Sequence, residues 1–320
     1  MVNDFKIFSG SSNRPLAEKI AENLGKSVSV CTLERFSDGE VFFQIDENIR
    51  GMDVFIIQST NPPADNLMEL FIMIDACVRA SARRITAVIP YYGYSRQERK
   101  DQPRVAISAK LMANLITKAG VHRVLLMDLH ASQIQGFFDC PSDHLYSSRV
   151  FNKAIKGLGI KNGVAVAPDV GSVKLVRSFA KSLDFSLAIV DKRRPDINLA
   201  KVMNIVGEVK GKDVVLRDDM VDTAGTLSEA AIALKEHGAR RIVAACTHAV
   251  LSGQAMERID KSPIEKFFIS DTVYHPAGEL GSKMKVLSVS TEFAEAILRI
   301  HEERSLSSLF EDGQDAPRRN

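Results

Sequence analysis

Two pairs of similar segments recur in the same order along the chain, and they constrain its fold more than any other feature. The first pair is GMDVFIIQST, from Gly51, and GKDVVLRDDM, from Gly211, 160 residues later. The second pair is ARRITAVIP, from Ala82, and ARRIVAACT, from Ala239, 157 residues later. Two matches at nearly one spacing predict two similar domains that arose by duplication. The alternative is that strand starts of the ARRI type are simply common in α/β proteins.

Short β-branched runs alternate with helical patterns along the chain. DVFIIQST is followed by NLMELFIMIDACVRASA, which has helical spacing, and then by the strand-like run RRITAVIPYY. This βαβα order predicts an α/β fold in which each domain is a mostly parallel sheet flanked by helices. We place the domains at residues 1–146 and 147–303. A C-terminal tail follows at 304–320, and we expect its end to be disordered because it has few apolar residues.

The composition is that of an ordinary globular protein. The 320 residues are 45% hydrophobic and 26% charged, with a formal net charge of +2. A nearly neutral chain without a broad basic face does not favour nucleic acid as a partner. No apolar run approaches the ~20 residues of a membrane span, and the start lacks the pattern of a secretory signal. The four cysteines have neither metal-finger nor redox spacing, so we expect a cytoplasmic protein with buried, reduced thiols.

The segment VVLRDDMVDTAGT places two acids directly after an apolar run. We expect DVVL to be a buried strand with Asp218 and Asp219 at its carboxyl end. Parallel α/β sheets bind their ligands at that edge. Because carboxylates only accept hydrogen bonds, this acid pair suits either sugar hydroxyls or a metal ion.

A tight loop follows the acid pair. Thr226 and Glu229 have the spacing of a capping box, which predicts a helix from Thr226 to Gly238. The N–H groups and the dipole at such a helix start favour a phosphate. Gly225 allows close approach of the backbone, and the hydroxyls of Thr223 and Thr226 add donors. Two acids that can bind hydroxyl groups, beside a loop that can bind phosphate, indicate a sugar phosphate such as ribose 5-phosphate. The alternative is an ordinary βα turn with solvated acids.

VVLRDDMVDTAGT resembles the phosphoribosyl diphosphate (PRPP) motif of type I phosphoribosyltransferases, and other segments narrow the resemblance to the ribose-phosphate diphosphokinase (PRPP synthase) family. These segments are RFSDGE (35–40), ENIRG (47–51), QSTNPPADNLMELFIMIDA (58–76), RITAVIPYYGYSRQERK (84–100), MDLHASQIQGFFDCPSDHL (127–145), APDVG (167–171) and DKRRP (191–195). The resemblance implies two phosphoribosyltransferase-like domains. It also implies transfer of the diphosphoryl group of Mg-ATP to O1 of D-ribose 5-phosphate, which gives PRPP and AMP for nucleotide biosynthesis.

The resemblance also implies roles for residues of the second domain. Ribose 5-phosphate would be bound by Arg194, Asp218, Asp219, Asp222, Thr223, Ala224, Gly225 and Thr226. LAIVDKRRP is expected to be a buried strand that ends in cations, which can stabilise the charge on a phosphoryl group in transfer; a solvated charge run is the alternative. By resemblance Lys192 is the main catalytic residue, Arg194 assists it, and residues 195–201 form a mobile loop.

Further residues are assigned to Mg-ATP. RVLLMDLHA ends in Asp128 and His130, and GVAVAPDVG contains Asp169. By itself His130 indicates a structural histidine, because Mg²⁺ prefers oxygen ligands and keeps its waters. The resemblance instead assigns His130 and Asp169, with Asp128 as a further candidate, to the Mg²⁺ of Mg-ATP. It assigns Arg96 and Gln97 to ATP, although aromatic residues beside Arg96 also suit stacking on bases.

The resemblance predicts a homo-oligomer, a hexamer by analogy, with ATP sites shared between subunits. RFSDGE indicates only a turn, but in the family it reaches the adenine pocket of a neighbouring subunit. This assigns ATP binding to Phe36, Asp38, Gly39 and Glu40. ADP and phosphate are regulators in the family, and the candidates for such a site here are Arg50, Arg104 and SLSSLF (305–310).

Three residues depart from the family pattern. Arg217 stands where an aliphatic residue precedes the acid pair, Ser172 replaces a glycine after DVG, and Ala106 replaces a proline. A buried guanidinium at position 217 needs a partner, for example an acid near the site. These departures keep open a non-catalytic regulatory subunit related to the synthase, and the shared motif keeps open a nucleobase phosphoribosyltransferase.

Overall fold

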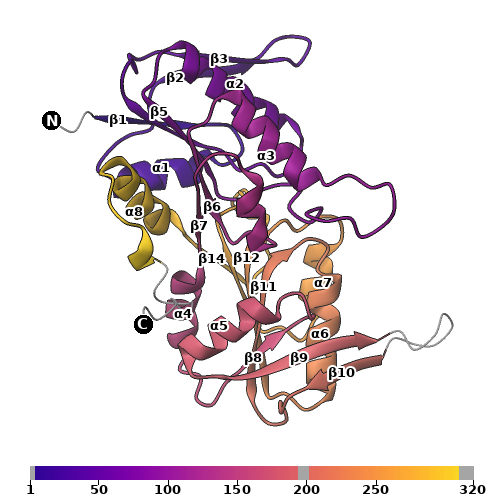
Figure 1. The fold of residues 1–320 in the computed structure, drawn as a ribbon. Coiled ribbons are helices and arrows are strands. Elements are labelled where there is room, and N and C mark those ends of the chain that lie inside the picture. Colours follow the sequence, from indigo (N-terminus) through magenta and orange to yellow (C-terminus); the bar gives the residue numbers. More distant parts are fainter. Residues whose placement is uncertain (1–3, 194–201, 310–320) are drawn as a thin grey trace, which may run out of the picture. The chain divides into compact units, whose positions relative to one another are not determined.

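The chain divides into two compact units (Figure 1), seen in a computed structural model that describes residues 4–193 and 202–309. Unit 1 holds the residues up to Tyr146, together with Thr272–Tyr274 and Val289–Leu309. Unit 2 holds Ser147–Asp271 and His275–Ser288. Each unit is an α/β fold with its own sheet and its own hydrophobic core, which confirms the predicted fold class.

Unit 1 is built on a five-stranded parallel sheet in the order β1-β4-β5-β6-β7. Its strands are β1 (Phe5–Ser9), β4 (Asp53–Ile57), β5 (Arg84–Ile89), β6 (Arg123–Met127) and β7 (Ser142–Leu145). The helical elements of the unit are α1 (Arg14–Asn23), α2 (Asp65–Arg79), α3 (Ser108–Ala119), α8 (Ser290–His301) and the short 3-10 turns Ser132–Phe137 and Ser307–Leu309. Helices α2 and α3 form a core with one face of the sheet, and α1 and α8 lie together on the other side (Figure 1). An antiparallel hairpin, β2 (Cys31–Arg35) with β3 (Val41–Ile45), packs against α2.

Unit 2 has a seven-stranded sheet in the order β10-β9-β8-β11-β12-β13-β14, antiparallel between β10 and β9 and parallel elsewhere. The strands are β8 (Val164–Ala167), β9 (Ser186–Arg193), β10 (Val202–Val206), β11 (Asp213–Val221), β12 (Arg241–Ala249), β13 (Lys266–Ser270) and β14 (Met284–Leu287). The helices are α4 (Ser148–Lys156), α5 (Val173–Leu183), α6 (Gly225–Glu236) and α7 (Ala255–Lys261). One core joins α4 and α5 to one face of the sheet, and another joins α6 and α7 to the other face. Burial on both faces explains why the central strands are continuously apolar.

One unit boundary differs from the sequence expectation. Unit 1 gives way to unit 2 between Tyr146 and Ser147. The second domain was expected to run to residue 303, but α8 belongs to unit 1. The reason is tertiary packing, because α8 lies against α1 and its last residue, His301, contacts β4. The expected disordered end of the tail, residues 310–320, lies outside the described residues.

The repeated segments have a common structural role at the start of a central strand. Asp213 begins β11, is buried, and accepts a hydrogen bond of 2.7 Å from Nε of Arg240, at the edge of β12. Asp53 begins β4, is 2% exposed, and accepts hydrogen bonds from Nε of Arg83 (3.0 Å) and Nε of Arg84 (2.9 Å), at the start of β5. The acid of each GxD segment therefore pairs with the ARRI segment in its own copy, with both arginines in unit 1 and with the first arginine in unit 2.

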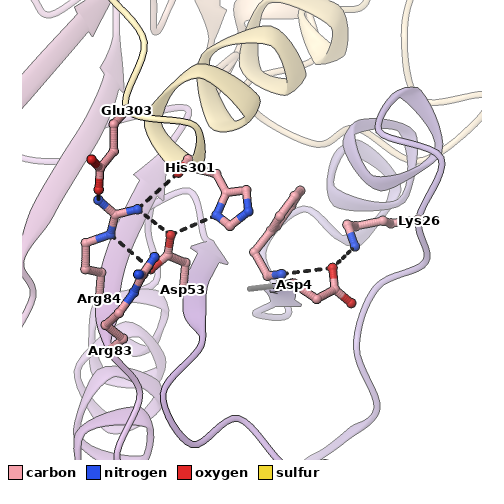
Figure 2. Close-up of polar contacts among 8 residues, drawn as sticks. Asp4, Lys26, Asp53, Arg83, Arg84, His301 and Glu303 are labelled. Atoms are coloured by element: carbon pink, nitrogen blue, oxygen red, sulfur yellow. Dashed lines mark hydrogen bonds and ion pairs between the residues drawn. The ribbon is translucent and has the colours of Figure 1, made fainter. Parts of the chain in front are cut away.

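In unit 1 the same acid also holds the C-terminal helix (Figure 2). Nδ1 of His301 lies 2.8 Å from Oδ2 of Asp53, and Arg84 donates to the carbonyl of His301 at 3.2 Å. Burial by itself would raise the pKa of Asp53, but hydrogen bonds from Arg84, His301 and Arg83 outweigh it and lower the pKa to about 2. Asp53 therefore stays ionised and joins β4, β5 and α8.

Two further expectations from composition concern thiols and membranes. All four cysteines lie in the described residues and are free, but only Cys77 and Cys246 are buried; Cys31 and Cys140 are partly exposed. Burial raises the pKa of the Cys77 thiol to about 12. Among the helices of the described residues, none is both long and apolar enough to cross a bilayer.

Candidate active site

The acid pair lies at the carboxyl end of β11, in the middle of the unit 2 sheet. The strand runs to Val221, so Asp218 and Asp219 are part of it; the sequence placed them just beyond a shorter strand. Both side chains are half-buried, and the N–H of Asp219 donates to Oδ1 of Asp218 at 3.0 Å. The position of both acids at the carboxyl edge of the parallel sheet is the predicted one.

A third acid lies near this pair. Asp169 follows β8, the parallel neighbour of β11, and is exposed. Burial raises the pKa of Asp218 well above its ordinary value, and the negative charges of Asp219 and Asp169 raise it further. This end of the sheet therefore concentrates negative charge in unit 2, and a cation or hydroxyl donors would relieve it.

The loop after β11 differs from the prediction in how its helix begins. Helix α6 starts at Gly225, one residue early, and its N-cap is Ala224, without a side-chain cap hydrogen bond. The capping box of Thr226 and Glu229 is therefore wrong. Ala224 has φ 57°, which turns the chain so sharply that Thr226 already lies in the first helical turn. The helix ends at Glu236, two residues before the predicted end, and Gly238 follows it with φ 83°.

The predicted ligand groups of this loop are accessible. Thr223 and Thr226 are exposed, Asp222 and Gly225 are half-buried, and Ala224 is buried. The hydroxyls of both threonines and the N–H groups of the first turn of α6 lie at one helix start, where donors gather. The geometry suits a small anion beside the acid pair.

Two residues that support this loop were missed by sequence reasoning. Ser252 donates from its hydroxyl to Asp222 Oδ1 and from its N–H to the Asp222 carbonyl, the latter at 3.0 Å. Arg258, on α7, donates from Nη1 to the Thr223 carbonyl at 2.9 Å. Both contacts are tertiary, and no local pattern around SGQAMERID connects it to a loop 30 residues earlier. Arg258 also brings a positive charge to the loop expected to bind phosphate.

The departure at Ser172 is explained by the backbone. Ser172 has φ −83°, a conformation open to every residue, so glycine is not required there. Its N–H donates to Asp169 Oδ1 at 3.1 Å, and its hydroxyl donates to the Asp169 carbonyl at 3.1 Å. Serine at this place therefore fixes Asp169. Ala106 is exposed in the coil before α3, and nothing in the structure explains its replacement of proline.

The cationic segment begins on an antiparallel strand pair. Lys192 lies on β9, and its Cα partner is Met203 of β10. Arg194 and the predicted mobile loop at 195–201 lie outside the described residues. The expected strand before the cations is thus present.

The first segment of unit 1 with a predicted role in ATP binding is the loop after β5. Arg96 and Gln97 are exposed there. The Gln97 carbonyl accepts a 3.3 Å hydrogen bond from Ala109, so the loop is attached to the start of α3. The reading of this loop as an aromatic stack for bases is wrong for Tyr91 and Tyr92, which are 4% and 2% exposed and belong to the interior.

The second segment of unit 1 with an assigned ligand role follows β6. Asp128 is buried with φ 37°, and its N–H donates to the Leu145 carbonyl at 3.0 Å. His130, two residues later, is exposed. Asp169 belongs to unit 2. Within the two described stretches of chain, no group of three or more His, Cys, Asp or Glu side chains is arranged to hold a metal ion.

The third segment is the tip of the β2–β3 hairpin. A turn closes it, with hydrogen bonds of 2.9 Å from Gly39 to the Phe36 carbonyl and from Phe36 to the Glu40 carbonyl. Asp38 accepts from the N–H of Glu40 at 3.0 Å. Phe36 is 54% exposed although it is aromatic. The tip therefore presents an aromatic ring and two carboxylates to the surroundings of unit 1.

Comparison with known proteins identifies both ends of the chain. Residues 5–120 match the family described as the N-terminal domain of ribose phosphate pyrophosphokinase, and residues 191–311 match the phosphoribosyl synthetase-associated domain. The chain is 57% identical over 312 residues to the ribose-phosphate pyrophosphokinase of Chlorobaculum tepidum, with 97% of this chain and 96% of the relative covered. It is 54% identical to that of Campylobacter jejuni, with 96% and 99% covered.

A solved structure agrees with these relatives. The crystal structure of phosphoribosylpyrophosphate synthetase from Mycobacterium smegmatis superimposes with a TM-score of 0.89 at 37% identity. The match covers 94% of this chain and 100% of that one. The similarity therefore extends over both units.

Proposed function

The chain belongs to the ribose-phosphate pyrophosphokinase family, and from this premise we propose how its own residues carry out the family's reaction. The enzyme transfers the diphosphoryl group of ATP to O1 of D-ribose 5-phosphate and gives PRPP and AMP. Relatives of this name match nearly the full length of the chain. Neither a nucleobase phosphoribosyltransferase nor a non-catalytic subunit is adopted, because no observation favours either.

The observation that carries the proposed sugar site is the carboxyl end of β11. Asp218 and Asp219 accept hydrogen bonds from the ring hydroxyls, for which acceptor-only carboxylates are suited. Residues 222–226 bind the 5-phosphate through backbone N–H groups and the exposed hydroxyls of Thr223 and Thr226. Arg258 fixes this loop through the Thr223 carbonyl. Arg194 adds a cation to the phosphate end of the sugar.

Lys192 and Arg194 are the proposed catalytic cations. O1 of the sugar attacks the β-phosphorus of ATP in line, the bond between the α–β bridging oxygen and the β-phosphorus breaks, and AMP leaves with that oxygen. The O1 proton passes to solvent or to a phosphate oxygen. Negative charge spreads over the transferred group during this step, and fixed cations stabilise it more than they stabilise the ground state. Positioning of the two substrates supplies the rest.

The residues of unit 1 are proposed to bind ATP. Arg96 and Gln97 are exposed on the loop after β5, and Phe36, Asp38, Gly39 and Glu40 form the hairpin tip that is proposed to reach a neighbouring subunit. His130, Asp128 and Asp169 are proposed to hold Mg²⁺. Asp169 fits this role because its carboxylate lies close enough to the acid pair to raise the pKa of Asp218, and carboxylate oxygens are ligands that Mg²⁺ prefers. When bound, Mg²⁺ would neutralise phosphate charge on ATP.

The test of the catalytic role is Lys192→Ala in the full-length enzyme, with AMP formation as the readout. We expect turnover to fall by about 10³-fold or more, as for loss of a principal charge-stabilising group, while ribose 5-phosphate still binds. Lys161→Ala, an exposed lysine of the same unit, is the matched control and should retain full activity. A Lys192→Ala enzyme with near wild-type turnover would remove Lys192 from the mechanism.

The shared ATP site and the hexamer are tested by mixing subunits. Phe36→Ala and Lys192→Ala disable different parts of the proposed site. If the hairpin tip serves a neighbour, co-refolded or co-expressed mixtures regain activity that neither variant has, and light scattering gives a homo-oligomer. Mixtures without any regained activity would show that each subunit uses its own hairpin. Adding ADP or phosphate to the same assay tests the proposed effectors.

A further inference from the structure

Arg217 is a fully buried cation immediately before the acid pair. Its side chain is 0% exposed, and it has the largest volume among the fully buried side chains of the described residues. It lies on β11 next to Asp218. Burial of a guanidinium is costly unless hydrogen bonds replace its water, so its surroundings indicate what it does.

Hydroxyl and carbonyl oxygens from three elements of unit 2 accept hydrogen bonds from the guanidinium. Nη1 donates to the carbonyl of Asp218, and Nη2 donates to Ser147 Oγ at 3.0 Å and to Thr247 Oγ1 at 2.8 Å. Its central carbon lies 4.5 Å from the ring centroid of Phe151 on α4. These three acceptors are the oxygens of two hydroxyls and one carbonyl; the acid partner that the sequence suggested stays a prediction. Arg217 therefore connects the backbone of the acid pair to β12 and to the start of α4.

The chain contains its own comparison for this position. Arg217 is the sixth residue after Gly211, and Ile57 is the sixth after Gly51 in the other copy of the repeat. Ile57 is 1% exposed and apolar, and the residue after it is Gln58 rather than an acid. An aliphatic side chain thus suffices to fill this place in the sheet. The cation occurs in the copy that carries the acid pair.

Strand pairing explains why the backbone at this end of β11 benefits from the hydrogen bond that Arg217 donates. The register of β11 with β8 runs from Val214 to Leu216, whereas its register with β12 continues to Val221. The acid pair therefore lies beyond the stretch that is paired with β8. A side chain that donates to the Asp218 carbonyl and is itself fixed by Thr247 of β12 restrains the backbone there.

We propose that Arg217 is a positioning residue for ribose 5-phosphate, because its guanidinium fixes the backbone at Asp218 and so places the acid pair for the sugar hydroxyls. This inference rests on the proposed binding of the sugar by Asp218 and Asp219. Small displacements of a binding group cost much of its effect. The predicted consequence is a loss specific to the sugar substrate.

The test compares Arg217→Met with Arg240→Met in the full-length enzyme. Both changes remove an arginine that contacts β11, but Arg240 contacts Asp213 at the opposite end of the strand. We expect Arg217→Met to raise the KM for ribose 5-phosphate by about ten-fold, as for a modest displacement of a binding group, with the KM for ATP unchanged. Arg217→Lys, which keeps a donor, should recover part of the loss. Arg240→Met should leave both KM values unchanged.

If Arg217→Met does not fold, Thr247→Val tests the positioning role of Arg217 instead. This isosteric change removes one acceptor of the guanidinium and should raise the KM for ribose 5-phosphate in the same direction by a smaller factor. The inference is overturned if both variants lower only the melting temperature, or if they raise the KM for ATP as much as that for ribose 5-phosphate. Asp219→Asn tests sugar binding by the acid pair separately from the positioning role of Arg217. An unchanged KM for ribose 5-phosphate in that variant would refute the acid-pair assignment itself, whatever Arg217 does.

Discussion

The central strands β4 and β11 begin alike and end differently. Each begins with a buried aspartate that accepts hydrogen bonds from arginine at the start of the next strand. At its carboxyl end β4 continues into the neutral residues Gln58 and Ser59, whereas β11 carries Asp218 and Asp219 near its carboxyl end. The shared start is part of the scaffold, and the divergent end is where we propose that the sugar phosphate binds. In a duplicated α/β fold, the two ends of one strand can therefore serve separate purposes.

The two acids that represent these ends have opposite electrostatic environments. Cations and donors surround Asp53 and lower its pKa to about 2. Burial and neighbouring carboxylates raise the pKa of Asp218. Ionised Asp53 therefore stabilises the fold, and ionised Asp218 destabilises it, which is typical of a group retained for function.

The largest expected effect follows from breaking the scaffold end in unit 1. Asp53→Asn removes the charge shared by Arg83, Arg84 and His301, and we expect it to lower the free energy of unfolding by about 3 kcal/mol, since a buried ion pair loses one partner. Urea unfolding of the purified enzyme measures this. KM values of the folded fraction should not change; equal stability of variant and wild type would show that the cluster in Figure 2 does not hold α8.

Neutralising Asp218, at the carboxyl end of β11, should raise stability, which is the opposite of the effect expected for Asp53→Asn. Asp218→Asn removes a carboxylate from a site of like charge, so we expect a higher melting temperature without added divalent metal. The same change should lower kcat/KM for ribose 5-phosphate by about 100-fold, or roughly 2.7 kcal/mol, through loss of a charged hydrogen bond. A variant that is less stable, or one that turns over normally, would contradict this view of Asp218.

The pH dependence of the free energy of unfolding should report the ionisation of Asp53, at the start of β4. The pKa of Asp53 falls from 3.8 to about 2 on folding, so its stabilisation is complete above about pH 4 and disappears as the pH falls toward 2. This shift corresponds to about 2 kcal/mol. The wild-type free energy of unfolding should therefore fall more steeply between pH 4 and 2 than that of Asp53→Asn. Parallel curves would show that another group is responsible.

The smallest expected effect concerns the phosphate loop. An added Cβ at Gly225 would lie 3.6 Å from Arg258 Nη1 and 3.8 Å from Thr223 Oγ1, which are ordinary contacts. Gly225→Ala should therefore fold with an unchanged or higher melting temperature. If the loop binds phosphate closely, the KM for ribose 5-phosphate should rise by about five-fold, because the new methyl group adds bulk among the donors. An unchanged KM would place the phosphate elsewhere.

The sequence predicted the fold class through local patterns, whereas the ligand roles of most site residues came from the family resemblance and stay predictions. Apolar runs, helical spacing and the repeat located the strands and the acid pair at its sheet edge. What it missed depends on tertiary structure. The helix start at Gly225 is set by the left-handed Ala224 rather than by Thr226, α8 joins unit 1 through packing and His301, and Arg258 reaches the loop from a separate helix. No local pattern encodes these contacts.

The most direct test of the account compares matched residues of the two strands. Asp219 and Ser59 occupy equivalent positions, each the eighth residue after the repeat glycine, and Ser59 donates to the Thr272 carbonyl at 2.6 Å within unit 1. Ribose 5-phosphate would be titrated calorimetrically into wild type, Asp219→Asn and Ser59→Ala, with Mg²⁺ and a non-hydrolysable ATP analogue at saturation. The account predicts strongly weakened sugar binding in Asp219→Asn and wild-type binding in Ser59→Ala. Wild-type binding by Asp219→Asn, or an equal loss in both variants, would contradict it.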